Sequence, residues 1–118
     1  MDGLWGRRSL MSSSQAAAAV RNGTATSIEL VKKSAALARA HSAGAGTNAF
    51  ITVRDEQSLL NAASAIDASV HKGERVGRLA GVPIAVKDNI CVSGLPCSAG
   101  SRMLSRFVAP YTATQCSA

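Results

Sequence analysis

The stretch that decides the fold class is Gly77-Arg78-Leu79-Ala80-Gly81-Val82-Pro83-Ile84-Ala85-Val86-Lys87-Asp88-Asn89-Ile90. Residues 82–86 lack the alternation of polar and apolar side chains that marks a half-exposed strand. Such a run is typical of a short strand that is covered on both faces, as in a mostly parallel sheet. It predicts that Lys87 lies at the end of this strand. Partial desolvation there disfavours the ammonium form and leaves an amine that accepts a proton.

Two helices are predicted in the first third of the chain. The serines at 12–14 are good N-cap residues for a short helix through Val20, which the pair Asn22-Gly23 ends. The segment 26–29, Thr-Ser-Ile-Glu, fits a capping box for a second helix that ends at 42–46. Apolar residues at three- and four-residue spacing mark the buried face of this second helix: Ile28, Val31, Ala35 and Ala38, joined by Leu30 and Leu37.

A second strand and a third helix are predicted before the apolar run. Residues 48–53 are rich in β-branched and aromatic side chains, as strands are. Asp55 or Ser58 then opens a helix that Lys72-Gly73-Glu74 stops. Its buried stripe consists of Leu59, Ala62, Ala63, Ile66 and Val70. The order helix, strand, helix, strand is that of an α/β sheet.

Composition and charge exclude several classes of function. The 118 residues are enough for one domain, but aromatic residues make up only 3% and alanine supplies much of the apolar content, so the core is expected to be thin. The net charge of +6 is spread over small clusters without interleaved aromatic residues, which argues against a nucleic-acid site. No apolar stretch approaches the roughly 20 residues that a bilayer span requires.

The cysteines and the N-terminus bear on the compartment. Cys91, Cys97 and Cys116 form no close C-x-x-C pair, and their odd number argues against a secreted disulfide framework. A reducing compartment is the simpler interpretation. Residues 1–13, with two arginines and several serines, fit either a disordered leader or a weak organellar transit peptide. The stretch 91–101 is rich in small residues, which is compatible with a site-lining loop and equally with an ordinary surface connection.

One family combines these features. The run 79–89, followed by Gly94-Leu95-Pro96, resembles the opening of the amidase signature family. Residues 48–53, and later 101–104 and 110–114, are most similar to the branch formed by the A subunits of tRNA-dependent amidotransferases. The resemblance covers residues 14–114. It implies an α/β/α sandwich around a mixed sheet, of which 14–114 would be the N-terminal portion and therefore incomplete in this chain.

The resemblance also implies a catalytic role for Lys87, which matches the family's lysine. In that family the lysine takes a proton from a serine in a cis peptide, and this serine relays the proton from a nucleophilic serine that attacks an amide carbonyl. An oxyanion hole of backbone N–H groups stabilises the intermediate. The glycine- and serine-rich segment that carries both serines lies well downstream in the family. Four serines of this chain lie too close to Lys87 to be those residues: Ser93, Ser98, Ser101 and Ser105.

Partners and cofactors follow from the same resemblance. It implies glutamine as substrate, ammonia transfer to a B subunit, a small C subunit, and contact with tRNA only through the complex. ATP and magnesium are implied for the holoenzyme and no cofactor for this chain. The expected setting is mitochondrial translation, with the cytoplasm or a plastid as alternatives. Residues 115–118 depart from the family pattern and are expected to be a divergent tail of a truncated product that is inactive alone.

Two other hypotheses stay open at this point. One is a non-catalytic interaction module that occupies the partner surface of complete subunits without forming a site. The other is the N-terminal piece of a different amidase signature hydrolase, which acts on a small amide and has no tRNA partner. Co-purification with a B-type subunit would favour the first, and a glycine-serine segment in frame beyond Thr114 would indicate an enzyme.

Overall fold

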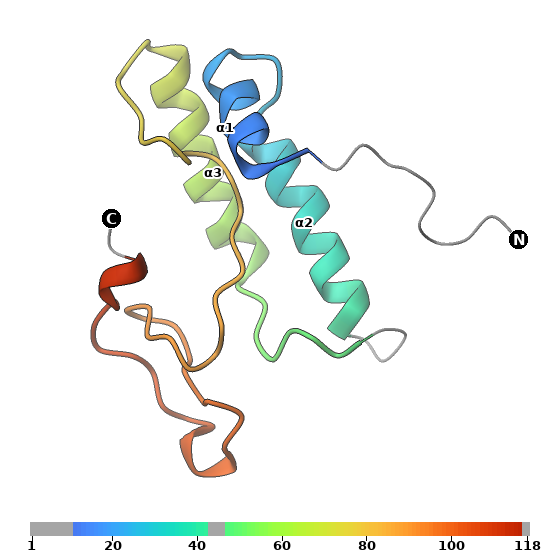
Figure 1. The fold of residues 1–118 in the computed structure, drawn as a ribbon, viewed down its shortest axis with the longest axis vertical. Coiled ribbons are helices and arrows are strands. Elements are labelled where there is room, and N and C mark those ends of the chain that lie inside the picture. The colour runs from blue at the N-terminus through green and yellow to red at the C-terminus, as the bar shows by residue number, and fades with distance from the viewer. Residues whose placement is uncertain (1–10, 43–46, 117–118) are drawn as a thin grey trace, which may run out of the picture. The chain divides into compact units, whose positions relative to one another are not determined.

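The computed structural model describes residues 11–42 and 47–116 (Figure 1). These residues form two compact units: one contains the described residues up to Ala36 together with Arg54–Pro83, and the other contains those of 37–53 and of 84–116. The predicted leader, 1–13, and the predicted tail, 115–118, lie partly outside the described residues.

Helix α1 spans Ser13–Arg21 and begins as its sequence predicts. The Ser12 hydroxyl accepts the Gln15 N–H at 3.2 Å, and the Gln15 side-chain oxygen accepts the Ser12 N–H at 2.8 Å. This reciprocal pair satisfies two backbone donors that a helix start otherwise leaves without partners. Asn22 is the C-cap, and Gly23 follows with φ +71°. The predicted start and end of the first helix are both confirmed.

Helix α2 spans Ser27–Ser42 and crosses from the first unit into the second. The predicted capping box is present: the Thr26 hydroxyl accepts the Glu29 N–H at 3.2 Å, and the Glu29 carboxylate accepts the Thr26 N–H at 3.3 Å. The predicted stripe is buried at Val31, Ala35 and Ala38. Leu37 was expected to join it, but 60% of its surface is exposed.

Helix α3 spans Glu56–His71. Its N-cap is Asp55, whose carboxylate accepts the Ser58 N–H at 2.8 Å, and its C-cap is Lys72. Ala63 is buried, whereas Ala62, which was also expected in the stripe, is exposed. The existence and limits of the third helix are therefore confirmed, and its buried face is narrower than predicted.

The first unit has a core of small side chains. Helix α1 packs against α3, and the side chains of Val20 and Ser27 are the largest that are fully buried. Asp67 of α3 caps α2 from outside, because its carboxylate accepts the N–H groups of Ser27 at 2.7 Å and Ile28 at 3.2 Å. The Ser27 hydroxyl donates to the Gly81 carbonyl at 3.1 Å. The small size of the buried side chains confirms the expected thin core. Hydrogen bonds between segments add to its stability.

The predicted strands do not form within the described residues. Neither 48–53 nor 82–86 is a strand, and ladder pairing is seen as an isolated antiparallel bridge between Pro96 and Val108. A strand requires a neighbour for its backbone N–H and C=O groups, and the described part of the chain gives neither segment one. The apolar run is also uncovered, because 71% of the Ile84 surface is exposed. The mixed sheet is therefore not confirmed.

Besides the end of α2, the described residues of the second unit form turns and two short 3-10 helices. These are η1, Arg102–Leu104, and η2, Thr114–Cys116. The Ser101 hydroxyl accepts the Met103 N–H at 3.3 Å and so caps η1. Backbone hydrogen bonds between the loops fix the conformation of this irregular unit. Lys87 belongs to one of its irregular segments.

Candidate functional site

Lys87 lies at the end of the irregular segment 82–87, directly before a turn. Its carbonyl accepts the Ile90 N–H at 2.9 Å, which closes that turn. The side chain of Lys87 is exposed. The described residues therefore do not supply the desolvation that a strand end in a covered sheet would give. The strand at 82–86 and the desolvation of Lys87 both require neighbouring strands, and the described residues contain none that pairs with 82–86.

Asp88, the next residue, is fixed by the loop 98–100. Its carboxylate accepts the Ser98 N–H at 3.0 Å and a short hydrogen bond from the Ser98 hydroxyl. Its carbonyl accepts the Ala99 N–H at 3.0 Å. The Ser98 hydroxyl is the main reason that the pKa of Asp88 lies below its ordinary value of 3.8, and partial burial opposes this effect. The backbone directly after Lys87 is thus held in one place.

We expect Ser98→Ala to raise the pKa of Asp88 toward 3.8, because the alanine removes the strongest donor to the ionised carboxylate. A lowered folded-state pKa stabilises the loop above the ordinary pKa, and this contribution is lost as the pH falls through the lowered value. Carboxyl chemical shifts followed by NMR during an acid titration measure the change. Ser101→Ala is the matched control, since its hydroxyl caps η1; equal pKa values in the two variants would contradict this assignment.

Two of the four serines that follow Lys87 use their hydroxyls in contacts within the loops. The Ser98 hydroxyl is engaged by Asp88, and the Ser101 hydroxyl caps η1. The Ser93 N–H donates to the Thr112 hydroxyl at 3.0 Å. The hydroxyls of Ser98 and Ser101 thus have structural contacts, and the catalytic role of Lys87 stays a prediction from the resemblance.

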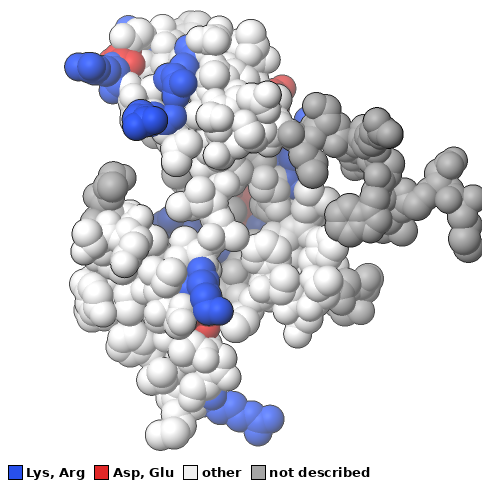
Figure 2. Space-filling view, in the orientation of Figure 1, with Lys and Arg blue, Asp and Glu red and all other residues white. Residues whose placement is uncertain are grey.

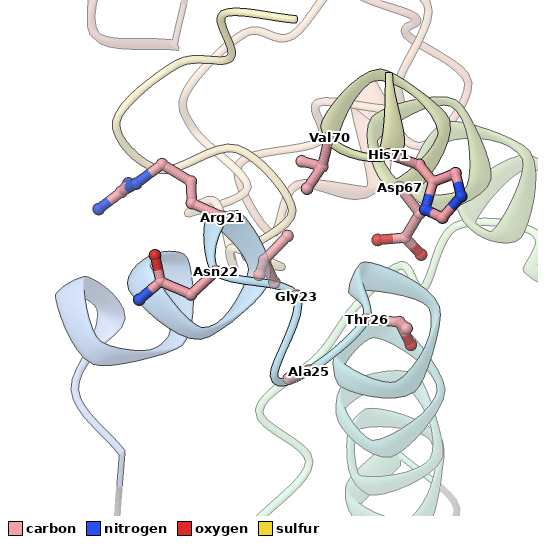
Figure 3. Close-up of a pocket in the computed structure, with 9 residues that line it drawn as sticks. Arg21, Asn22, Gly23, Ala25, Thr26, Asp67, Val70 and His71 are labelled. Carbon is pink, nitrogen blue, oxygen red and sulfur yellow. The ribbon is translucent and has the colours of Figure 1, made fainter. Parts of the chain in front are cut away.

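A concave region lies on the first unit, away from Lys87 in the sequence. An open surface pocket of about 510 Å³ is lined by the end of α1, the loop between α1 and α2, and the last turns of α3. Figure 3 shows Asp67 and His71 beside Thr26, with Arg21 extending away from them. The Asp67 carboxylate already occupies the N–H donors of α2, and the Arg21 guanidinium donates to the Arg78 carbonyl at 2.6 Å. The Asp67 and Arg21 side chains at this pocket are therefore engaged in contacts that hold the fold, and Lys87 is not among the lining residues.

On the face that Figure 2 shows, lysine and arginine side chains stand in small separate groups. Within the described ranges, no group of three or more His, Cys, Asp and Glu side chains is placed to hold a metal ion. None of the described helices combines the length and apolar character needed to cross a membrane.

Comparison with known proteins connects this chain to one family. The amidase family profile matches residues 30–117, a range that includes Lys87 and the loops around it. Three curated relatives are all named as the A subunit of glutamyl-tRNA(Gln) amidotransferase. That of Alkaliphilus metalliredigens is 46% identical over 67 residues, covering 57% of this chain and 13% of the relative.

The other two relatives come from different organisms and match this chain with similar identity and coverage. That of Synechococcus sp. (strain JA-3-3Ab) is 49% identical over 65 residues, covering 55% of this chain and 13% of the relative. That of Cenarchaeum symbiosum is 48% identical over 69 residues, covering 58% of this chain and 14% of the relative. The matched part of this chain thus corresponds to about one seventh of the length of these relatives.

Proposed function

This chain belongs to the amidase family, and we propose that it supplies the catalytic lysine, Lys87, of the A subunit of a glutamyl-tRNA(Gln) amidotransferase. The reaction proposed for the complete subunit is hydrolysis of the side-chain amide of glutamine to release ammonia. The observation that carries the proposal is the position of Lys87 inside the matched range, directly before a residue whose backbone and carboxylate are both fixed by hydrogen bonds.

The proposed role of Lys87 is that of a proton acceptor. Its amine takes a proton from a bridging serine, which takes one in turn from the nucleophilic serine as that serine attacks the amide carbonyl. Such a relay requires that the backbone of the lysine is fixed in position, because the two heavy atoms that exchange the proton must lie within about 3 Å of one another. The turn at 87–90 and the contacts of Asp88 with Ser98 provide this rigidity on the side that this chain contains.

We propose that residues 82–86 become a strand of a mixed sheet in a complete amidase domain. We place these residues as a strand that pairs with other parts of a complete amidase domain. Ile84 supports this placement, because 71% of its surface is exposed although its side chain is apolar and belongs to an apolar run. Pairing on both edges would cover this run and would partly desolvate the Lys87 side chain, which the described residues leave exposed.

Within this proposal, the 118 residues alone do not hydrolyse glutamine. They contain neither the glycine-serine segment nor the two serines that the relay needs, and Ser98 and Ser101 have structural roles instead. One lysine without a nucleophile and an oxyanion hole provides little rate enhancement. The chain therefore contributes one part of the site.

For the complete subunit, the proposed partners are an amidotransferase B subunit, which receives the ammonia, and a small C subunit. Glu-tRNA(Gln), ATP and magnesium are assigned to that assembly and not to this chain. The described residues gather no set of acidic, histidine or cysteine ligands for a metal. We propose mitochondrial translation as the setting, with plastid or cytoplasmic translation as the alternatives.

A chimera tests the proposal. Residues 30–114 of this chain replace the matching segment of the Alkaliphilus metalliredigens relative, and the product is assembled with B and C subunits of that organism. We expect glutamine hydrolysis well above that of the same relative with the segment deleted and nothing inserted. A folded, assembled chimera that releases no ammonia would contradict the proposal. Hydrolysis of other small amides in preference to glutamine would instead indicate a different amidase.

A further inference from the structure

Two cysteines of the second unit lie side by side although five residues separate them in the sequence. The Cys91 thiol donates a hydrogen bond to the Cys97 sulfur at an S to S distance of 3.7 Å. The Cys97 thiol donates onward to the Asp88 carbonyl at 3.3 Å. All three cysteines of the chain are free thiols. The spacing of the two cysteines, which is not that of a C-x-x-C motif, does not by itself indicate this contact.

A tight turn brings the two thiols together. The Leu95 N–H donates to the Val92 carbonyl at 2.9 Å, and Gly94 has φ +78°. A positive φ near this value at the third residue is the requirement of a type II turn. Because the turn reverses the chain between Cys91 and Cys97, the two sulfurs face each other from opposite ends of it.

The segment 107–113 holds both ends of this turn. The Ala113 N–H donates to the Cys91 carbonyl at 2.8 Å, and the Cys97 N–H donates to the Phe107 carbonyl at 3.1 Å. In the middle, Gly94 and Ala109 are joined by a hydrogen bond of 2.9 Å from N–H to carbonyl. The thiols are thus positioned by backbone contacts on both flanks, and not by a single flexible loop.

The two thiols differ in access. Cys97 is buried with 6% of its surface exposed, whereas Cys91 is partly exposed. Burial first, and then the neighbouring Cys91 thiol, raise the pKa of the Cys97 thiol above its ordinary value. Hydrogen bonding to Cys91 also raises the pKa of Tyr111. Cys91 is therefore the thiol that an oxidant from solvent meets first, and Cys97 is the one that follows.

We propose that Cys91 and Cys97 are a modification site for reversible two-electron oxidation by a small disulfide of the glutathione class. The Cys91 thiolate attacks one sulfur of oxidised glutathione, and a first glutathione thiol leaves. Cys97 then loses its proton, its sulfur attacks the Cys91 sulfur, and a second glutathione thiol leaves. Two protein thiols become one disulfide, while one glutathione disulfide becomes two thiols. The sulfurs need to approach from 3.7 Å to about 2.05 Å.

Oxidation has a local consequence next to Lys87. The Cys97 thiol loses the proton that it donates to the Asp88 carbonyl, so this hydrogen bond is lost in the disulfide form. Asp88 keeps its contacts with Ser98 and Ala99. The redox state of the two thiols thereby determines whether the Asp88 carbonyl, directly after Lys87, accepts a hydrogen bond from Cys97.

The test equilibrates the full 118-residue chain in glutathione buffers of increasing oxidised fraction, followed by acid quenching, alkylation, trypsin digestion and mass spectrometry. Trypsin cuts after Lys87 and Arg102, so one peptide, 88–102, holds both cysteines and Cys116 falls in another. The internal disulfide is read as the loss of two hydrogen masses from that peptide. We expect its equilibrium constant to be at least about tenfold larger in the native chain than in urea.

Single variants separate the pair from other thiol chemistry. Cys116→Ser should leave the oxidation of peptide 88–102 unchanged. Cys97→Ser should stop at a glutathione adduct on Cys91, and Cys91→Ser should leave Cys97 largely reduced because it is buried. The proposal would be overturned by equal equilibrium constants in the native and urea-unfolded chains, by pairing of either cysteine with Cys116, or by equally fast adduct formation in the two pair variants.

Discussion

Lys87→Ala in the amidase chimera is expected to lower the kcat for glutamine hydrolysis by about 10³-fold, within the range of general acid and base catalysis. The proposed relay delivers the proton of the nucleophilic serine to this one amine, and alanine leaves it without an acceptor. KM should change little, because Lys87 is proposed to act on a proton and not to bind glutamine. Ammonia release under saturating and limiting glutamine measures both constants.

Two further variants make this test specific. Lys87→Arg keeps the positive charge and most of the length but has no accessible neutral form, so it should lose activity almost as fully as alanine. Lys72→Ala removes an exposed lysine at the C-cap of α3 and should leave kcat unchanged. An active Lys87→Arg chimera would mean that charge, and not proton acceptance, is the contribution of this position.

Gly81→Ala is expected to destabilise the chain by about 2 to 5 kcal/mol. A left-handed backbone at a residue with a Cβ costs about 1 to 2 kcal/mol, and overpacking of the core costs about 1 to 3 kcal/mol. Gly81 has φ +82°, and an added Cβ would lie 2.9 Å from the Val20 Cγ1 and 3.1 Å from the Ser27 Cβ. Both neighbouring side chains are fully buried. Urea unfolding monitored by circular dichroism measures the loss.

Gly73→Ala is the matched control for this substitution. Gly73 has a similar φ of +73°, but nothing lies within 4 Å of the Cβ that alanine would add. Its expected cost of about 1 to 2 kcal/mol is therefore the backbone term alone. The difference between the two variants isolates the contact of Gly81 with Val20 and Ser27. Equal losses would mean that this contact does not limit the packing of the first unit.

The helices were predictable because their signals are local. Ser12 with Gln15, and Thr26 with Glu29, define helix starts within four residues of sequence, and both capping boxes are present. Asp67 was not predictable in the same way. It caps α2 from a position 40 residues away in the sequence, and no local pattern indicates such a contact. Periodicity likewise could not tell that Leu37 would be exposed, since exposure depends on which segments pack against the helix.

The strands were not predictable because a strand is defined by its partner. Residues 82–86 have the composition of a covered strand, but hydrogen bonding to a second segment decides whether one forms, and the described residues provide none. The family motif was sufficient to identify Lys87 as the candidate residue. Its expected desolvation was not predictable, because it depends on strands that the described residues do not contain. The thiol pair had a signal that was overlooked: Ser93-Gly94 is a turn pair placed between Cys91 and Cys97.

The most direct test of the central claim is ammonia release from glutamine by the purified 118-residue chain, beside its Lys87→Ala variant, with and without B and C subunits. The claim is that this chain carries the lysine of an amidase site but not its nucleophile. We therefore expect the two proteins to be equally inactive in both settings, while the chimera that contains residues 30–114 of the chain is active. Ammonia release by the 118-residue chain that disappears in the Lys87→Ala variant would contradict the claim, because it would require a nucleophile within these residues.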